Sequence, residues 1–246
     1  MSILSFFKSN RLKKPPTCTA VIAAAGLSQR CEGEDKLFYE INSKPVIAYT
    51  LDAFQKCRLV DDIIIVAHED KIDNFAAICR ENNFNKVSKI IKGGSTRVES
   101  VLNGIFAVSS KARLIAIHDG ARPCTDIKII EDTIHKAALF NAAAPAVLIT
   151  STVKRAENDI IYKTVNREDL YDIQTPQIFR AELIKAALTN VVNKSLEITD
   201  DCTAVEIIGA KVFITDGSRK NIKITDNEDL KIAEAFLKER TQVLCG

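Results

Sequence analysis

Short, mostly apolar runs recur along most of the chain. They lie at residues 20–25, 63–66, 87–91, 114–117 and 146–149, and glycine or polar residues follow four of the five. Runs of this kind are typical of strands that are buried on both faces, as in a parallel sheet. We therefore expect five strands whose carboxyl ends lead into polar loops.

Helical patterns lie between these runs. Apolar residues recur at helical spacing behind Thr96 and Glu99, which are spaced as a capping box, at positions Val98, Val101, Leu102 and Ile105. Further helices are predicted over residues 126–140 and from about Asp226 onward, where apolar residues again share one face. Alternating strands and helices predict a doubly wound α/β fold with a mostly parallel sheet.

The stretch from residue 152 to residue 166 departs from this alternation. Residues 152–155 and 160–165 flank a polar turn at 157–159, which predicts a β-hairpin that forms an arm on the sheet. No internal repeat or low-complexity segment is present. We expect a basic tail over residues 1–16 and a single domain over residues 17–246.

Composition excludes several classes of protein. Hydrophobic residues make up 46% and charged residues 27%, as in an ordinary globular protein, and no uncharged apolar run approaches the ~20 residues that a membrane span needs. Lys and Arg number 34 against 32 Asp and Glu, so bulk charge gives no footprint for nucleic acid and a basic site must be a local cluster. Seven widely spaced cysteines without a CxxC pair, and only three histidines, argue against structural zinc and for a reducing compartment, so we expect the cytoplasm.

Polar groups follow the first predicted strand, where ligands of open α/β sheets bind. Gly26 leads into Arg30 and Lys36, so loop amides and two cations are available to a phosphate. The segment is neither a GxGxxG fingerprint nor a Walker A loop. The alternative is a plain turn with exposed basic residues.

The third and fourth predicted strands also end in candidate chemistry. Gly93 and Gly94 either form a simple turn or let the backbone approach a base or ribose. Asp119 and Arg122 suit the recognition of a polar substrate or a metal, or form a local ion pair.

The order of these segments resembles that of the 2-C-methyl-D-erythritol 4-phosphate cytidylyltransferases of the non-mevalonate isoprenoid pathway. The resemblance runs from about residue 19 to residue 237. It rests on AAGLSQR with Lys36, GGSTRVESVLNGI, HDGARP, STVKRA, QTPQIF, ITDDCTAVE and NIKITDNEDL. It implies a Rossmann-like nucleotidyltransferase that transfers CMP from CTP to 2-C-methyl-D-erythritol 4-phosphate, which gives 4-diphosphocytidyl-2-C-methyl-D-erythritol and pyrophosphate.

The resemblance also implies roles for individual residues. The catalytic cations are Arg30, Lys36 and Lys223. The residues that bind CTP are Ala24, Ala25, Gly26, Gly94, Ser95 and Ser100. The residues that bind the acceptor are Asp119, Arg122, Thr152, Arg167, Thr175 and Thr199. The sequence departs from the family at Ala23, where a proline is usual, and at Ser28, where a second glycine is usual.

The reaction that the resemblance implies needs Mg²⁺ or another divalent cation, for which the sequence identifies no protein ligand. A homodimer through the β-arm is expected, without nucleic acid or membrane partners. Two alternatives stay open: a cytidylyltransferase for another polyol phosphate such as ribitol 5-phosphate, and a catalytically silent nucleotide-binding regulator. Arg122, Thr152 and Arg167 favour the methylerythritol acceptor, and the three catalytic cations argue against a silent protein.

Overall fold

The computed structural model describes residues 17–26 and 35–245, and the side chains of these residues up to 240. The basic tail predicted for residues 1–16 lies outside the described residues. So do Arg30 and Ser28 of the predicted phosphate loop. Within the described ranges, no helix combines the length and the apolar character that crossing a bilayer demands.

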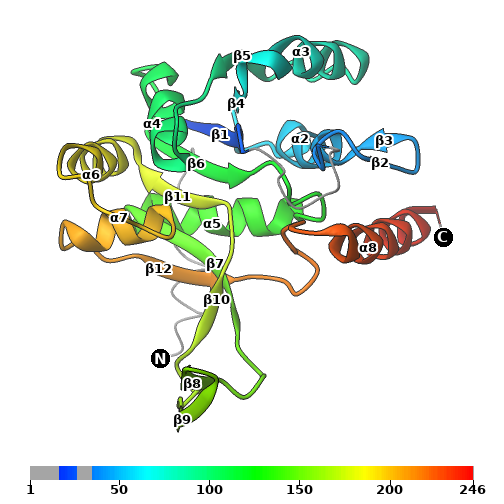
Figure 1. Cartoon of the computed structure of the whole chain (residues 1–246). Coiled ribbons are helices and arrows are strands. Elements are labelled where there is room, and N and C mark those ends of the chain that lie inside the picture. The colour runs from blue at the N-terminus through cyan, green and yellow to red at the C-terminus, as the bar shows by residue number, and fades with distance from the viewer. Residues whose placement is uncertain (1–16, 27–34, 246) are drawn as a thin grey trace, which may run out of the picture.

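One eight-stranded sheet forms the centre of the molecule (Figure 1). Four strands pair in parallel in the order β5-β4-β1-β6, and they are β1 (Cys18–Ala24), β4 (Asp62–Ala67), β5 (Val87–Lys92) and β6 (Leu114–Asp119). Beyond β6 lie β11 (Gln177–Arg180), β7 (Ala142–Leu148), β10 (Tyr171–Ile173) and β12 (Phe213–Asp216). The predicted doubly wound, mostly parallel sheet is confirmed.

The second half of the sheet is mixed, which the sequence did not predict. β11 pairs antiparallel with both β6 and β7, and β10 pairs antiparallel with β7, whereas β12 is parallel to β7. β7 also begins at Ala142, ahead of the predicted run at 146–149. Only four residues form β11, and such a short strand carries no periodicity that distinguishes it from a turn.

Helices cover both faces of the sheet, as a doubly wound fold requires. One face packs against α2 (Val46–Lys56), α3 (Ile72–Glu81), α5 (Ile127–Phe140) and α8 (Asn227–Cys245). The other face packs against α4 (Arg97–Ala107), α6 (Ala181–Asn193) and α7 (Asp201–Ile207). Three small elements lie outside the main sheet and its helices: β2 (Glu40–Ile41), β3 (Lys44–Pro45) and the 3₁₀ turn η1 (Glu69–Lys71).

Strand periodicity divides the apolar residues between two cores. Ala20 and Ile22 of β1 face the core under α2 and α5, whereas Val21 between them faces the core under α4. Gly104 lets α4 lie close to the sheet, because a Cβ at this position would come within 2.4 Å of the Val21 Cγ1. This close packing holds the second half of α4 directly against β1 and β4.

The predicted cap at Thr96 is confirmed, and Asp126 caps a second helix without having been predicted to do so. The Thr96 side chain accepts a hydrogen bond from the Glu99 N–H at 3.1 Å, and Asp126 accepts one from the Lys128 N–H at 2.8 Å. The Glu99 carboxylate accepts a hydrogen bond from the backbone N–H of Ser95. In a strict capping box it would accept one from the next residue, Thr96.

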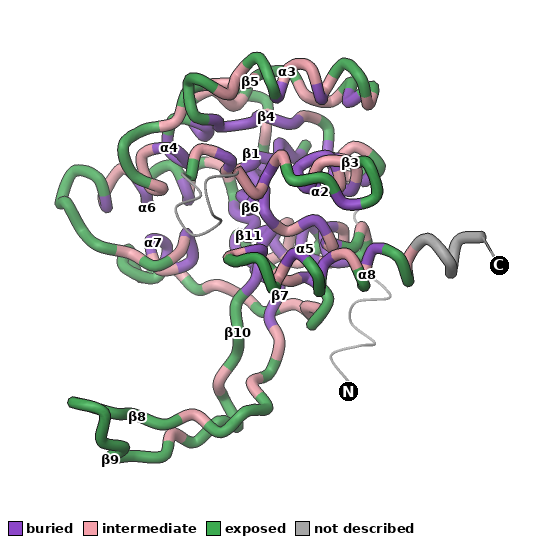
Figure 2. Tube along the Cα trace, turned by 45° about the vertical axis from the view of Figure 1, so that its right-hand side comes forward, coloured by how far each residue is buried: buried purple, intermediate pink, exposed green. Residues whose placement is uncertain are grey.

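The predicted hairpin is confirmed as β8 (Lys154–Glu157) and β9 (Ile160–Thr164), which form a two-stranded antiparallel ribbon. Asn158 and Asp159 both have positive φ, at 50° and 65°, as a tight hairpin turn requires. The ribbon projects from the sheet, and every residue of its two strands is exposed (Figure 2).

Candidate active site

A pocket of about 590 Å³ lies at the carboxyl ends of β1, β4, β5 and β6, where ligands of open α/β sheets bind. The predicted site residues that line it are Ala24, Ala25, Gly26, Lys36, Gly94, Ser95, Ser100, Asp119 and Lys223. These residues come from five separate stretches of sequence. The fold brings them into one cavity.

The loop between β5 and α4 forms one wall of the pocket. The Ser100 side chain accepts a hydrogen bond from the Gly94 N–H at 3.0 Å and donates one to the Thr96 carbonyl at 2.8 Å. The Glu99 carboxylate accepts bonds from both the N–H and the hydroxyl of Ser95. A Cβ at Gly94 would lie 2.4 Å from the Glu99 Cβ, so only glycine fits there. The wall is therefore a hydrogen-bonded backbone surface.

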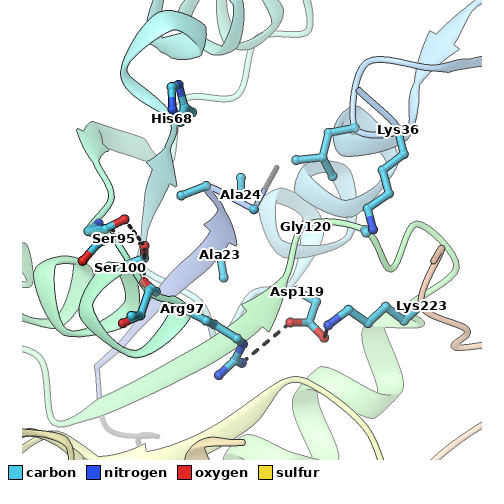
Figure 3. A pocket seen from close by; sticks show the side chains of 16 residues that line it. Ala23, Ala24, Lys36, His68, Ser95, Arg97, Ser100, Asp119, Gly120 and Lys223 are labelled. Carbon is cyan, nitrogen blue, oxygen red and sulfur yellow. Dashed lines mark hydrogen bonds and ion pairs between the residues drawn. The ribbon is translucent and has the colours of Figure 1, made fainter. Parts of the chain in front are cut away.

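Asp119, the last residue of β6, forms the centre of a charged cluster on the floor of the pocket. Its Oδ2 lies 3.2 Å from the Lys223 Nζ and 3.3 Å from the Arg122 Nε, and its Oδ1 lies 3.7 Å from a terminal nitrogen of Arg97. Figure 3 shows Arg97 and Lys223 pointing to Asp119 from opposite sides, with Lys36 directed toward the same part of the pocket. Burial raises the pKa of Asp119, but Lys223, Arg97 and Arg122 lower it by more and hold it at about 2. The carboxylate is thus ionised throughout the physiological range.

Arg97 was not predicted as a site residue. It begins α4 and makes a two-pronged ion pair with Asp201, with N–O distances of 3.2 and 2.8 Å. Burial lowers the pKa of Arg97, but Asp201, Asp119 and Asp200 together raise it by more, so the guanidinium remains charged. His68 also lines the pocket without having been predicted. Arg97 lies in the GGSTRVESVLNGI segment. A positive charge at the start of a helix that borders the predicted site was the feature of the sequence that could have identified it.

Two predicted acceptor-binding residues lie beside the pocket. Arg122 bonds to Asp119 and donates to the Asn221 carbonyl at 2.7 Å. Thr175 is buried behind Asp119, where its hydroxyl oxygen accepts from the Asp119 N–H at 3.2 Å and lies 3.0 Å from the His118 Nδ1. Arg122 thus holds the Asp119 carboxylate, and Thr175 holds the Asp119 backbone.

The structure places the remaining predicted residues at the rim or farther away. Thr152 and Arg167 are exposed at the base of the arm, and Arg167 donates to the Thr150 carbonyl. Thr199 is exposed just before α7, with its hydroxyl 3.3 Å from that of Thr203. A second cavity of about 450 Å³ lies at the base of the arm, and Lys223 lines both cavities.

Comparison with known proteins adds an independent finding. The sequence profile of the family described as 2-C-methyl-D-erythritol 4-phosphate cytidylyltransferase matches residues 18–239. A protein of that name from Clostridium perfringens is 42% identical over 89% of this chain and 98% of its own length. Its counterpart from Clostridium acetobutylicum is 43% identical over 90% and 98%, respectively.

The fold is also similar to that of solved structures. The crystal structure of 4-diphosphocytidyl-2C-methyl-D-erythritol synthase from Anaerococcus prevotii has a TM-score of 0.81 and 30% sequence identity, and the match covers 91% of this chain and 96% of that one. The sequence similarity and the structural similarity therefore extend over the same large part of the chain.

Proposed function

The chain belongs to the 2-C-methyl-D-erythritol 4-phosphate cytidylyltransferase family, and we propose that the pocket around Asp119 carries the transfer of CMP from CTP to 2-C-methyl-D-erythritol 4-phosphate. The observation that supports this location is the charged cluster of Arg97, Arg122 and Lys223 around Asp119, next to the backbone wall at Gly94. Cations beside a nucleoside-sized wall suit a nucleoside triphosphate and a second phosphate.

The reaction needs electrostatic stabilisation more than proton transfer. The acceptor phosphate attacks the α-phosphorus of CTP in line, the bond to the bridging oxygen breaks, and pyrophosphate leaves. Because the nucleophile is already an anion, no general base is required. Preorganised cations offset the repulsion between the two phosphates and the charge that grows on the transferred group.

We assign this stabilisation to Lys36 and Lys223, together with Arg30 on the strength of the family resemblance. Lys36 and Lys223 reach the pocket from opposite ends of the chain (Figure 3). CTP binds between the loop at Ala24, Ala25 and Gly26 and the opposite wall, where the cytosine and ribose contact Gly94, Ser95 and Ser100. Base choice then rests on the backbone wall, in which small residues leave room for a pyrimidine.

The acceptor binds on the Asp119 side of the pocket. We assign its recognition to the carboxylate of Asp119 and the guanidinium of Arg122, with Thr175 orienting Asp119 from behind. Thr152, Arg167 and Thr199 complete the acceptor site in an assembly of two chains.

Mg²⁺, or another divalent cation, enters with the CTP phosphates in this proposal. Asp119 is the only carboxylate among the described residues that line the pocket, and three cations already face it. In the part of the chain that the structure describes, no group of three His, Cys, Asp or Glu side chains is placed to hold a metal. These described residues do not fit a protein-held ion, and phosphate oxygens and water would then hold the cation. Chelation with EDTA should stop turnover, and added Mg²⁺ should restore it.

A pyrophosphate-release assay tests the proposed function. The chain should release pyrophosphate when CTP and 2-C-methyl-D-erythritol 4-phosphate are both present, and should not respond to ribitol 5-phosphate or other sugar-alcohol phosphates. The Asp119→Asn variant should lose most of this activity. Turnover with ribitol 5-phosphate alone would contradict the acceptor assignment, and binding of CTP without turnover would indicate a silent regulator.

The arm supports a dimer. Ile160, Ile161 and Tyr162 on β9 are 69%, 62% and 60% exposed, and an isolated two-stranded ribbon is marginally stable in water. Adjacent exposed apolar side chains of this kind mark interaction surfaces. We propose that each arm clasps a second copy of the chain, and that Arg167 at its base reaches the acceptor phosphate of the partner.

Mixed dimers provide the test. One subunit carries Lys36→Ala and the other carries Arg167→Ala, each nearly inactive as a homodimer. If Arg167 acts across the interface, the mixed dimer has one intact site, and random exchange should recover up to about a quarter of wild-type activity, because half of the dimers are mixed and each has one working site of two. If Arg167 serves its own subunit, every site lacks one group. No recovery despite demonstrated subunit exchange would therefore refute the shared site.

We also propose a cytoplasmic location. The five cysteines whose side chains the structure describes are all free thiols: Cys18, Cys57, Cys79, Cys124 and Cys202. Free thiols persist where the compartment is reducing. Recovery of the protein in the periplasmic or secreted fraction of its native cells would contradict this.

A further inference from the structure

Arg97 connects the two halves of the proposed site. It is the first residue of α4, directly after the cap residue Thr96, so its backbone continues the wall that faces the nucleoside. Its side chain crosses the floor of the pocket toward Asp119 on β6 (Figure 3). No other residue among those that line the pocket belongs to the nucleoside wall and also forms an ion pair with Asp119, within the described ranges.

Asp201 holds the guanidinium in place. The carboxylate of Asp201 is fully buried at the start of α7, and both of its oxygens accept hydrogen bonds from Arg97. A fork-to-fork pair of this kind fixes the plane of the guanidinium, which a lysine ammonium does not do. Since a buried ion pair is often no more stabilising than apolar packing, stability alone does not explain why these charges are here.

The two oxygens of Asp119 face different cations. Oδ2 contacts Lys223 and Arg122, whereas Oδ1 faces only Arg97 among the described side chains. Without Arg97, the attraction on the carboxylate becomes one-sided, and both the carboxylate and the Lys223 ammonium that it holds are free to shift. A displacement of about 1 Å at a reacting phosphate can cost about 100-fold in rate.

We propose that Arg97 is a positioning residue: anchored by Asp201, it fixes the Asp119 carboxylate, and through it the Lys223 ammonium, in the arrangement that receives the acceptor phosphate. This inference rests on the proposed roles of Asp119 and Lys223. It predicts that losing Arg97 affects use of the acceptor more than binding of CTP.

Substitution of Arg97 alone would leave the buried Asp201 carboxylate without a cation and endanger the fold. The main test is therefore the neutral pair Arg97→Gln with Asp201→Asn, in which two amides replace two charges. Arg97→Lys is the second variant, because it keeps the charge but loses the fork. The matched control is Arg180→Gln with Glu182→Gln, which removes an arginine–carboxylate pair at the start of α6, away from the pocket.

Steady-state kinetics with each substrate varied in turn give the decisive measurement. In the neutral pair we expect kcat/KM for 2-C-methyl-D-erythritol 4-phosphate to fall ~30–100-fold and KM for CTP to change less than about threefold. Arg97→Lys should lose about tenfold on the acceptor side, and the control should match the wild type. If the neutral double variant folds and keeps wild-type kinetics with the acceptor, the inference is overturned. If the double variant does not fold, wild-type acceptor kinetics in Arg97→Lys would overturn it. So would a loss confined to KM for CTP.

Combination with Asp119→Asn separates this inference from the proposed function. If Arg97 acts through Asp119, the triple variant should be no slower than Asp119→Asn alone, because the effects of residues that act through one another do not add. A multiplicative loss in the triple variant refutes the positioning role while leaving Asp119 in the site. Wild-type activity of Asp119→Asn itself would refute the proposed role of Asp119.

Discussion

Acid should destabilise this protein through His118, which is fully buried on β6 beside the active-site carboxylate. The Thr175 hydroxyl lies 3.0 Å from its Nδ1, and the Thr125 hydroxyl lies 3.3 Å from its Nε2 and donates to the Asn221 side chain at 2.7 Å. Since Thr125 donates to Asn221, it accepts from the ring, and Thr175 donates to Nδ1. These partners assign the neutral ring with its proton on Nε2. A second proton, on Nδ1, would displace the hydrogen bond that the Thr175 hydroxyl donates there and would place a charge on a fully buried ring.

The structure sets the size of the effect. Burial lowers the pKa of His118 from 6.5 to about 3. The unfolded chain binds this proton near pH 6.5, so stability that is fully present above that pH is lost progressively as the pH falls toward 3. At about 1.4 kcal/mol for each pKa unit, the free energy of unfolding should fall by about 3 kcal/mol between pH 7.5 and pH 4.5. Asp119, with its pKa lowered to about 2, adds a loss only below about pH 4.

Urea unfolding followed by circular dichroism at several pH values, at one protein concentration, measures this slope. The His118→Gln variant should be less stable at pH 7.5, because the ring packs 4.8 Å from that of Phe54, but its stability should depend much less on pH down to 4.5. His135→Gln, an exposed substitution on α5, should keep the wild-type slope. An unchanged slope in His118→Gln would refute the reasoning.

Three further predictions follow from the pocket and its packing. Lys36→Ala should lower kcat ~10²–10³-fold, by analogy with the loss of one oxyanion donor, and should weaken CTP binding less. Near-normal turnover in the pyrophosphate-release assay would contradict the role of Lys36 in stabilising the transition state. CTP should be used in preference to UTP, ATP and GTP in a competition assay, since a hydrogen-bonded backbone wall reads the base, and equal use of UTP would reject that assignment. Gly104→Ala should destabilise the fold by ~1–3 kcal/mol in thermal unfolding, because the added Cβ would lie 2.4 Å from Val21 and 2.8 Å from Val66. We expect this steric clash to outweigh the higher helix propensity of alanine, which favours the variant by ~1 kcal/mol. Asn103→Ala, on the exposed side of the same helix, is its control.

Features that depend on local chemistry could be read from the sequence. The Thr96 cap and the turn at Asn158 and Asp159 each involve residues within a few positions of one another, and the structure confirms both. β1, β4 and β6 were predicted because burial on both faces demands unbroken apolar runs. β5 was also predicted as a strand, but it lies at the edge of the sheet and none of its residues is buried. The pocket followed from the rule that ligands bind at the carboxyl ends of such strands.

Features that depend on the folded neighbourhood could not be read in this way. The four residues of β11 do not predict that the strand inserts antiparallel between β6 and β7. The direction in which a strand pairs depends on the loops that connect it and on the strands beside it. The ion pair between Arg97 and Asp201 joins positions 104 residues apart. The sequence shows both charges, but only the fold brings together the first residue of α4 and the first residue of α7.

The charge balance of the pocket explains why a site that we propose for phosphate transfer contains buried carboxylates. Positive charges alone would repel one another and would swing toward solvent on flexible side chains. Asp119 and Asp201 hold Arg97, Arg122 and Lys223 in fixed positions, and with Lys36 the cluster keeps a local excess of two positive charges. The whole chain carries a net charge of only +2, so attraction of two anionic substrates depends on this local arrangement rather than on bulk charge. Fixed cations also need little reorganisation as charge moves to the leaving pyrophosphate, which is the condition under which electrostatic stabilisation is strongest.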